Sequence, residues 1–180
     1  MEELKKLKLN ELGRVSEKEY KDISKRKVIV VLDNIRSAHN VGSVFRTSDG
    51  FLFEEIVLVG ICPTPPNKEI TKTALGSEKT VPFKYLESAE EYIKELKGDG
   101  YKVYGIEQTN QSFSIKDVKE GKLDKVVYIL GNEVKGVSID LLRLCDDCIE
   151  IPMEGTKHSF NVSVCNGIVA WEFANKVDIK

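Results

Sequence analysis

Val28-Ile-Val-Val-Leu32 is a continuous run of apolar residues near the start of the chain, and it decides the expected fold. A short apolar run without polar alternation is typical of a strand buried on both faces, as in a parallel sheet. Comparable runs follow it, and they predict further strands at residues 55–59, 81–86, 101–106, 126–130 and 148–151.

The segments between these strands carry helical patterns. Val41, Val44 and Phe45 recur at helical spacing, and Ser88 is expected to cap a helix that runs to Lys97. Two more helices are expected at residues 138–144 and 159–176. Strands that alternate with helices predict an α/β domain with a mostly parallel sheet and helices on both faces.

The composition sets the class of protein before any motif is considered. Of 180 residues, 41% are hydrophobic and 31% are charged, which excludes a disordered chain, a collagen-like chain and a disulfide scaffold. No apolar run approaches the ~18 residues of a membrane span, and no apolar signal segment follows Met1, so we expect a cytoplasmic protein. Residues 27–180 suffice for one domain, and residues 1–26 are expected to form a helical arm.

The charge is nearly balanced over the whole chain but not along it. The net charge is −2, whereas residues 1–27 hold nine Lys or Arg and six acidic residues, a local net of +3. A nucleic-acid-binding protein is usually more basic than this. The first segment is either a basic face for a polyanion or a solvated helix of mixed charge.

Cys145-Asp-Asp-Cys148 has the CxxC spacing of zinc and redox sites. A structural zinc ion needs two further ligands, yet the other cysteines, Cys62 and Cys165, do not form a second pair with that spacing. A thioredoxin-like pair would stand between a strand and a helix, whereas this one leads into a predicted strand. We therefore expect reduced thiols and no metal.

Ligands of parallel sheets bind beyond the carboxyl ends of the strands, so the loops there are the candidate sites. No GxGxxG dinucleotide fingerprint is present. Residues 131–138 have the glycines and the serine of a phosphate-binding loop, but Val137 stands where that loop needs a lysine. Because His158 and Ser159 are adjacent and no GxSxG elbow exists, a serine hydrolase is also disfavoured.

Three segments that follow strands are more specific when they are taken together. They are Asn40-Val-Gly-Ser-Val-Phe-Arg-Thr47, then Leu130-Gly-Asn-Glu-Val-Lys-Gly136, then Ile151-Pro-Met153 followed by Ser159-Phe-Asn-Val-Ser-Val164. In this order they resemble the three motifs of the SpoU (TrmH-like) ribose methyltransferases of the SPOUT class. The resemblance covers roughly residues 28–175, and Thr73-Ala-Leu-Gly-Ser77 is similar to the family segment between the first two motifs.

The resemblance implies an activity and an assembly. The activity is methyl transfer from S-adenosylmethionine to a ribose 2′-OH of structured RNA by a homodimer with a C-terminal trefoil knot, which general chain rules would not predict. We expect tRNA rather than rRNA as the substrate, because the chain is close to a minimal catalytic core. The alternatives are a catalytically inert RNA-binding module of the same fold and an unrelated small-molecule α/β enzyme.

The resemblance also assigns roles to residues. It implies an active site that contains Arg46, Glu133, Ser159, Asn161 and Asn40. It further implies cofactor binding by Gly131, Ile151 and Phe160 through backbone groups, with Met153 lining the pocket and Glu107 as a weaker candidate. The chain departs from the family at Phe160, where Leu is frequent, and at Cys165, where Ala is common.

Physical reasoning points to the same first motif. Asn40 is expected to cap the helix that follows, and the free N–H groups at such a start attract an anion. Arg46 would lean over the bare surface of Gly42 towards this end and complete a phosphate site, unless it forms only a surface salt bridge. Alternatively, Asn132 and Glu133 form only a solvated turn that has no role in the site.

The last predicted helix bears on assembly. Its apolar residues point all round the helix axis, which indicates burial on more than one side. A second copy of the chain would cover the additional side, although burial within one chain is the simpler alternative.

Overall fold

The computed structural model describes residues 4–8, 11–13, 15–118 and 123–179. Within them the strands form one seven-stranded sheet in the order β3-β2-β1-β6-β4-β7-β5, and every neighbouring pair is parallel. The strands are β1 (Arg26–Asp33), β2 (Phe53–Val59), β3 (Phe83–Leu86), β4 (Lys102–Ile106), β5 (Phe113–Ser114), β6 (Val126–Leu130) and β7 (Asp147–Glu150). The predicted parallel α/β sheet is therefore confirmed.

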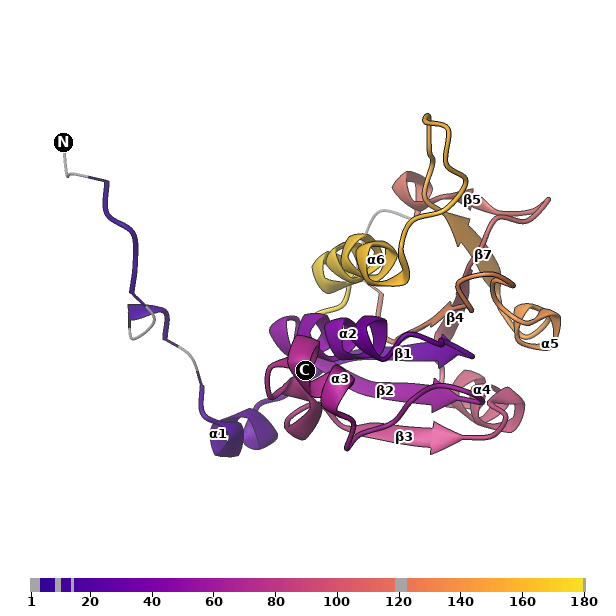
Figure 1. Cartoon of the computed structure of the whole chain (residues 1–180). Coiled ribbons are helices and arrows are strands. Elements are labelled where there is room, and N and C mark those ends of the chain that lie inside the picture. Colours follow the sequence, from indigo (N-terminus) through magenta and orange to yellow (C-terminus); the bar gives the residue numbers. More distant parts are fainter. Residues whose placement is uncertain (1–3, 9–10, 14, 119–122, 180) are drawn as a thin grey trace.

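Helices cover both faces of the sheet (Figure 1). The helices are α1 (Glu17–Asp22), α2 (Ala38–Gly50), α3 (Lys68–Ala74), α4 (Glu90–Gly98), α5 (Ile139–Leu142) and α6 (Val162–Lys176), with short 3-10 helices η2 (Ser77–Lys79) and η3 (Ile115–Asp117). Alternate residues of β1 separate the two cores, because Val28 and Val30 face α2 and α6 whereas Ile29 and Val31 face α4 and α5.

The order of the strands explains why distant motifs meet. β6 lies between β1 and β4, so the loops that follow these strands emerge side by side at one edge of the sheet. The end of the chain also returns to this sheet, where Val177 pairs with Leu123 and Ile179 pairs with Arg26. The trefoil knot stays a prediction that the family resemblance carries.

Several elements differ from the sequence-based expectation. α3, β5 and the 3-10 helices were not predicted, because each is too short to show a hydrophobic period. The last helix begins at Val162 rather than at 159, because Asn161 caps it by accepting hydrogen bonds from Ser163. α4 begins at Glu90 after Ala89, and Ser88 lies one residue before the cap.

The described residues 4–8 and 11–13 lie apart from the domain in Figure 1. Among the described residues of the amino-terminal segment the helix α1 is the regular element, and residues 4–8 have no regular structure. α1 is attached to the domain, because its Tyr20 is buried in the core beside α2. The boundary between residues 26 and 27 stays a prediction, and β1 itself begins at Arg26.

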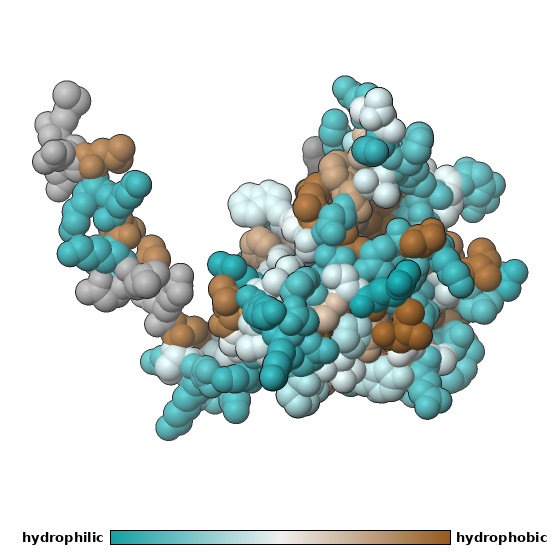
Figure 2. Space-filling model, in the orientation of Figure 1, coloured by the Kyte–Doolittle hydropathy of each residue, from teal (hydrophilic) through white to brown (hydrophobic). Residues whose placement is uncertain are grey.

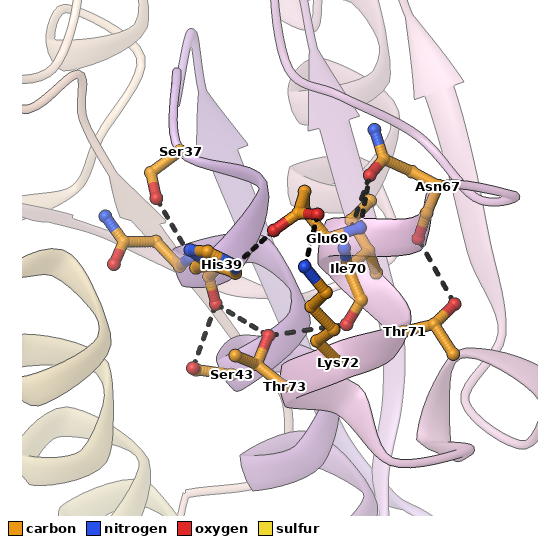
Figure 3. A network of polar contacts seen from close by, with 10 residues as sticks. Ser37, His39, Ser43, Asn67, Glu69, Ile70, Thr71, Lys72 and Thr73 are labelled. Atoms are coloured by element: carbon orange, nitrogen blue, oxygen red, sulfur yellow. Dashed lines mark hydrogen bonds and ion pairs between the residues drawn. The ribbon is translucent and has the colours of Figure 1, made fainter.

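α2 and α3 pack closely, and Figure 3 shows the polar contacts between them. The His39 imidazole lies 2.6 Å from a Glu69 carboxylate oxygen, and the Thr73 hydroxyl donates to the His39 carbonyl at 2.9 Å. Gly42 makes this approach possible, since a methyl group there would lie 2.2 Å from the Thr73 hydroxyl and 2.3 Å from the Ile70 carbonyl oxygen.

We expect Gly42→Ala to destabilise the protein by about 1–3 kcal/mol, because the added methyl group overpacks the α2–α3 contact. Urea denaturation measures this free energy of unfolding. Gly50→Ala is the matched control on the same helix, since a methyl group there meets nothing within 4 Å. Equal stability of the two variants would contradict the close packing of Gly42.

Candidate active site

A cavity of about 220 Å³ lies at the carboxyl edge of β4, β6 and β7. Its walls are apolar at Ile106, Leu130, Ile149 and Val162. The structure brings all five predicted cofactor positions to this one cavity: Glu107, Gly131, Ile151, Met153 and Phe160. These residues lie up to 53 positions apart in the sequence, so the sheet order is what assembles them.

Two glycines shape the loop after β6. A methyl group at Gly131 would lie 2.0 Å from the backbone nitrogen of Val137, so the loop folds directly against this position. Gly136 has φ of +70° and faces Glu107, whose carboxylate accepts a hydrogen bond from the Val137 N–H at 2.9 Å. Glu107 therefore ties the loop after β6 to the end of β4.

Asn132 makes the same loop rigid. Its backbone exchanges two hydrogen bonds with Gly136, and its side-chain oxygen accepts from the N–H groups of Val134 and Lys135. Its amide nitrogen donates to the carbonyl of Asn34, which follows β1, at 2.7 Å. The solvated turn that the sequence left open as the alternative is found here. It positions the next residue, Glu133.

Glu133 reaches across to the start of α2. Its carboxylate accepts hydrogen bonds from the backbone N–H groups of Arg36 and Ser37, both at 3.1 Å, and from the Asn40 amide at 3.2 Å. Burial alone would raise the pKa of the Glu133 carboxyl, but these hydrogen bonds outweigh burial and hold that pKa below its usual value. Glu133 is therefore a fixed anion.

Asn161 continues this network from α6. Its amide nitrogen donates to the Asn40 side-chain oxygen at 3.2 Å, while its own oxygen accepts from Ser163. Ser159 lies at the wall of the cavity. Glu133, Asn40, Asn161 and Ser159, predicted from separate motifs, thus gather around one cavity mouth.

Arg46 is not part of this cluster. It stands six residues beyond Asn40 on α2, which is about 9 Å along the helix axis. It lines a larger groove of about 820 Å³ with Phe51, Ile168 and Trp171, none of which lines the cavity. The larger groove holds none of the predicted cofactor positions, so the smaller cavity is the better cofactor candidate.

Two expectations about the first motif are wrong. Ser37, not Asn40, caps α2, because the Ser37 hydroxyl accepts from the Asn40 N–H at 3.2 Å. Gly42 offers no bare surface to Arg46, since α3 covers it. The anion at the start of this helix is the protein's own Glu133, which replaces the phosphate that we expected there.

The cysteines show no sign of activated thiols. Burial raises the pKa of the Cys145 thiol to about 12 and that of the Cys165 thiol to about 11. Within the described ranges, no three His, Cys, Asp or Glu side chains gather as metal ligands. In that same part of the chain, no helix is long and apolar enough to cross a membrane.

Sequence reasoning missed residues that support the site rather than line it. Asn34 has a positive φ of 55° and accepts hydrogen bonds from Asn132 and from the Ile61 N–H. Asp33 is buried and accepts from the Ser138 N–H. The one signal was Asp33-Asn34 directly after a buried strand, where Asn tolerates a left-handed backbone.

A scan against family models matches residues 27–171 to the "SpoU rRNA Methylase family". The match covers most of the chain. The chain belongs to the SpoU methylase family. The resemblance of the three motifs is therefore confirmed at the level of the family.

Among curated relatives, a tRNA (guanosine(18)-2'-O)-methyltransferase of Aquifex aeolicus is 31% identical over 167 residues, covering 92% of this SpoU chain and 74% of the relative. A 23S rRNA (guanosine-2'-O-)-methyltransferase of Neisseria meningitidis is 30% identical over 152 residues, covering 84% and 59% respectively. A mouse tRNA (guanosine(18)-2'-O)-methyltransferase is 29% identical over 152 residues, covering 83% of this chain, which spans 9% of that relative.

A solved structure agrees with the fold of this SpoU chain. The AdoMet-bound rRNA methyltransferase of Sinorhizobium meliloti matches with a TM-score of 0.76 at 26% identity. The match covers 87% of this chain and 59% of that one.

We expect Glu133→Gln to lower the stability at pH 7 by roughly 1 kcal/mol, the usual worth of a cap at a helix start. The amide N–H of glutamine would face one of the two backbone N–H groups whose hydrogen bonds the carboxylate now accepts. Because folding lowers the pKa of Glu133, this stabilisation is complete above the unfolded pKa and is lost as the pH falls through the folded pKa.

Urea unfolding of both proteins at pH 7 and near pH 3 measures this dependence. The difference between wild type and Glu133→Gln should shrink at the lower pH. Glu154→Gln is the matched control, since Glu154 is exposed and has no described partner. A difference that does not change with pH would mean that the Glu133 carboxylate does not hold α2.

Proposed function

We propose that this protein transfers a methyl group from S-adenosylmethionine to a ribose 2′-OH in structured RNA. The observation that carries the proposal is the single cavity lined by Gly131, Ile151 and Phe160, with Glu133, Asn40 and Asn161 joined at its mouth. Family membership and the RNA ribose methyltransferases among the relatives support the same reaction.

The cavity suits the cofactor chemically. Adenine needs apolar walls and backbone hydrogen-bonding groups, and residues such as Ile106, Ile149 and Gly131 supply them. No metal-binding group is needed for such a ligand. The AdoMet-bound structural relative supports this cofactor. When it is bound, S-adenosylmethionine supplies a methyl group on a positively charged sulfur.

The residues at the mouth would orient the ribose. Asn40 and Asn161 each use one amide N–H within the network. Asn40 donates to Glu133, and Asn161 donates to Asn40. Asn161 is exposed, so its second amide N–H is free to donate to the 2′ oxygen as that oxygen loses its proton to solvent. Glu133 fixes the amide orientations rather than acting as the base, because its carboxylate already accepts three hydrogen bonds.

Arg46 would act across a homodimer. In one chain it lies away from the cavity, beside a face of α6 on which Val164, Ile168 and Trp171 are exposed. These apolar side chains recur every three or four residues, so they form a stripe that a second copy would cover. A guanidinium keeps its proton at neutral pH, so Arg46 would bind phosphate or stabilise the developing alkoxide.

For the substrate we propose tRNA over rRNA. The relative of which the chain covers 74% is a tRNA enzyme, whereas coverage of the rRNA relative is 59%.

We assign residues 27–180 to the methyltransferase domain and residues 1–26 to an arm that adds to RNA binding. The exposed lysines Lys6 and Lys8 support that role, whereas the neighbouring Lys5 is paired with Glu11 at 2.9 Å.

Methyl transfer from radiolabelled S-adenosylmethionine tests the proposal. We expect label in the tRNA fraction of total RNA, and nucleoside analysis should find it on a ribose. Label in rRNA alone would overturn the substrate class but keep the reaction. Cofactor binding without any incorporation would instead indicate the inert RNA-binding module.

We expect Arg46→Ala to lower methyl transfer roughly 100-fold or more, the usual loss when a donor to a developing oxyanion is removed. Calorimetric affinity for S-adenosylmethionine should stay within about twofold, since Arg46 lies outside the cavity wall. Arg143→Ala on α5 is the control for loss of an exposed arginine. Retained turnover in Arg46→Ala would contradict the assigned role.

Mixing two inactive variants tests whether Arg46 acts across the dimer. A mixture of Arg46→Ala and Asn161→Ala should regain activity, because a heterodimer then contains one site with both groups intact. No recovery on mixing would place Arg46 and Asn161 at a site within one chain.

A further inference from the structure

Some cations of this protein are paired with carboxylates and others are not. Along the sheet and α4, five lysines are neutralised by carboxylates within 3.2 Å: Lys27, Lys84, Lys94, Lys97 and Lys102. In the loops after β1, β6 and β7, by contrast, Arg36, Lys135 and Lys157 are exposed. Within the part of the chain that the structure describes, none of these three side chains has a hydrogen-bond or ion-pair partner.

Arg36 is held beside the candidate active site while its own charge stays available. Its backbone N–H donates to Glu133, so the residue is fixed at the start of α2. The Glu133 carboxylate is already taken by backbone N–H groups and the Asn40 amide, and it does not bind the Arg36 guanidinium. A cation in this position can bind a further anion.

Lys135 stands on the other side of Glu133. Asn132 accepts its backbone N–H at 3.1 Å, so the base of this side chain is fixed by the same rigid turn. Its chain neighbours Val134 and Gly136 both line the cavity. Arg36 and Lys135 therefore flank the residue that orients the proposed ribose site.

Lys157 lies on the opposite rim, in the loop before Ser159. Gln108 anchors this loop by donating to the His158 carbonyl at 2.9 Å. Lys157 lines a hollow that adjoins the cavity and shares Ile151, Met153 and His158 with it. This loop stands at the top of Figure 2, where its surface is mostly hydrophilic, and Glu154 is its exposed acidic residue.

We propose that Arg36, Lys135 and Lys157 form a phosphate-binding rim that holds the RNA backbone on both sides of the target ribose. The inference rests on the proposed function. A ribose that enters the cavity mouth carries a phosphate on each side, and the three cations stand in the loops that border that mouth. Because phosphates are the same in every nucleotide, the rim would position RNA without reading its sequence.

Salt dependence of RNA affinity tests the rim. We would measure binding of total tRNA and of a single-stranded oligouridine between about 50 and 300 mM salt for Arg36→Gln, Lys135→Gln and Lys157→Gln. Each lost phosphate contact should lower the slope of log affinity against log salt by about 0.7–0.9, or roughly fivefold to eightfold in affinity near 0.1 M salt. Both RNAs should weaken within this range, with cofactor affinity unchanged.

Lys94→Gln on α4 and Arg143→Gln on α5 are matched controls, because both remove the same charge from cations that already have carboxylate partners. Slopes equal to those of the controls would overturn the rim, as would a wild-type protein that binds neither RNA. A wild type that binds RNA with the predicted slopes but transfers no methyl group would instead overturn the proposed function and leave the rim standing.

Discussion

The carboxylate of Glu133 at the start of α2 is the contact on which the site depends. Two backbone N–H groups and the Asn40 amide converge on it, so one side chain joins the loop after β6 to the loop after β1. Through Asn40 the same contact reaches Asn161 at the start of α6. A helix start with unpaired N–H groups favours an anion, and here the protein provides that anion itself. The three motifs are thus one hydrogen-bonded unit, and its geometry exists only after β6 has paired beside β1.

The sequence predicted the sheet well because its strands are apolar runs, which are typical of parallel strands buried on both faces. Short elements escaped it: α3 has 7 residues and β5 has 2, too few to show a period. The candidate site was predicted as a set of residues but not as an arrangement. The sequence predicts Asn40 as the cap because Asn is a good cap in isolation, whereas Ser37 three residues earlier takes that place and leaves the Asn40 side chain free to bind Glu133. The sequence alone predicts an open surface at Gly42, because nothing in it indicates that α3 packs there.

Arg46 and Glu133 lie apart within one chain, although both are expected to act in the same reaction. Both residues belong to family motifs, yet Arg46 faces the groove beside Trp171, which is 62% exposed. A large aromatic side chain that exposed on a buried-core helix is costly to leave in water. A second copy that covers this stripe would remove the apolar surface from water and bring an Arg46 towards another cavity. Burial of α6 and completion of the site would then have the same cause.

The net charge of −2 at first counts against an RNA enzyme, but a sum over the chain is the wrong quantity. Phosphate responds to charges within about one Debye length, roughly 8–10 Å in physiological salt. Lysines paired with carboxylates on the sheet and α4 contribute little to that local field, and neither do the acids that neutralise them. Near the cavity mouth the cations are Arg36, Lys135 and Lys157. The acids there are the exposed Glu154, then Glu150, which accepts from the Ser112 hydroxyl, and Glu133 and Glu107, which accept from backbone N–H groups. Unpaired cations in these loops can therefore bind an anion although the chain as a whole is acidic, so pairing, rather than composition, determines where an anion can bind.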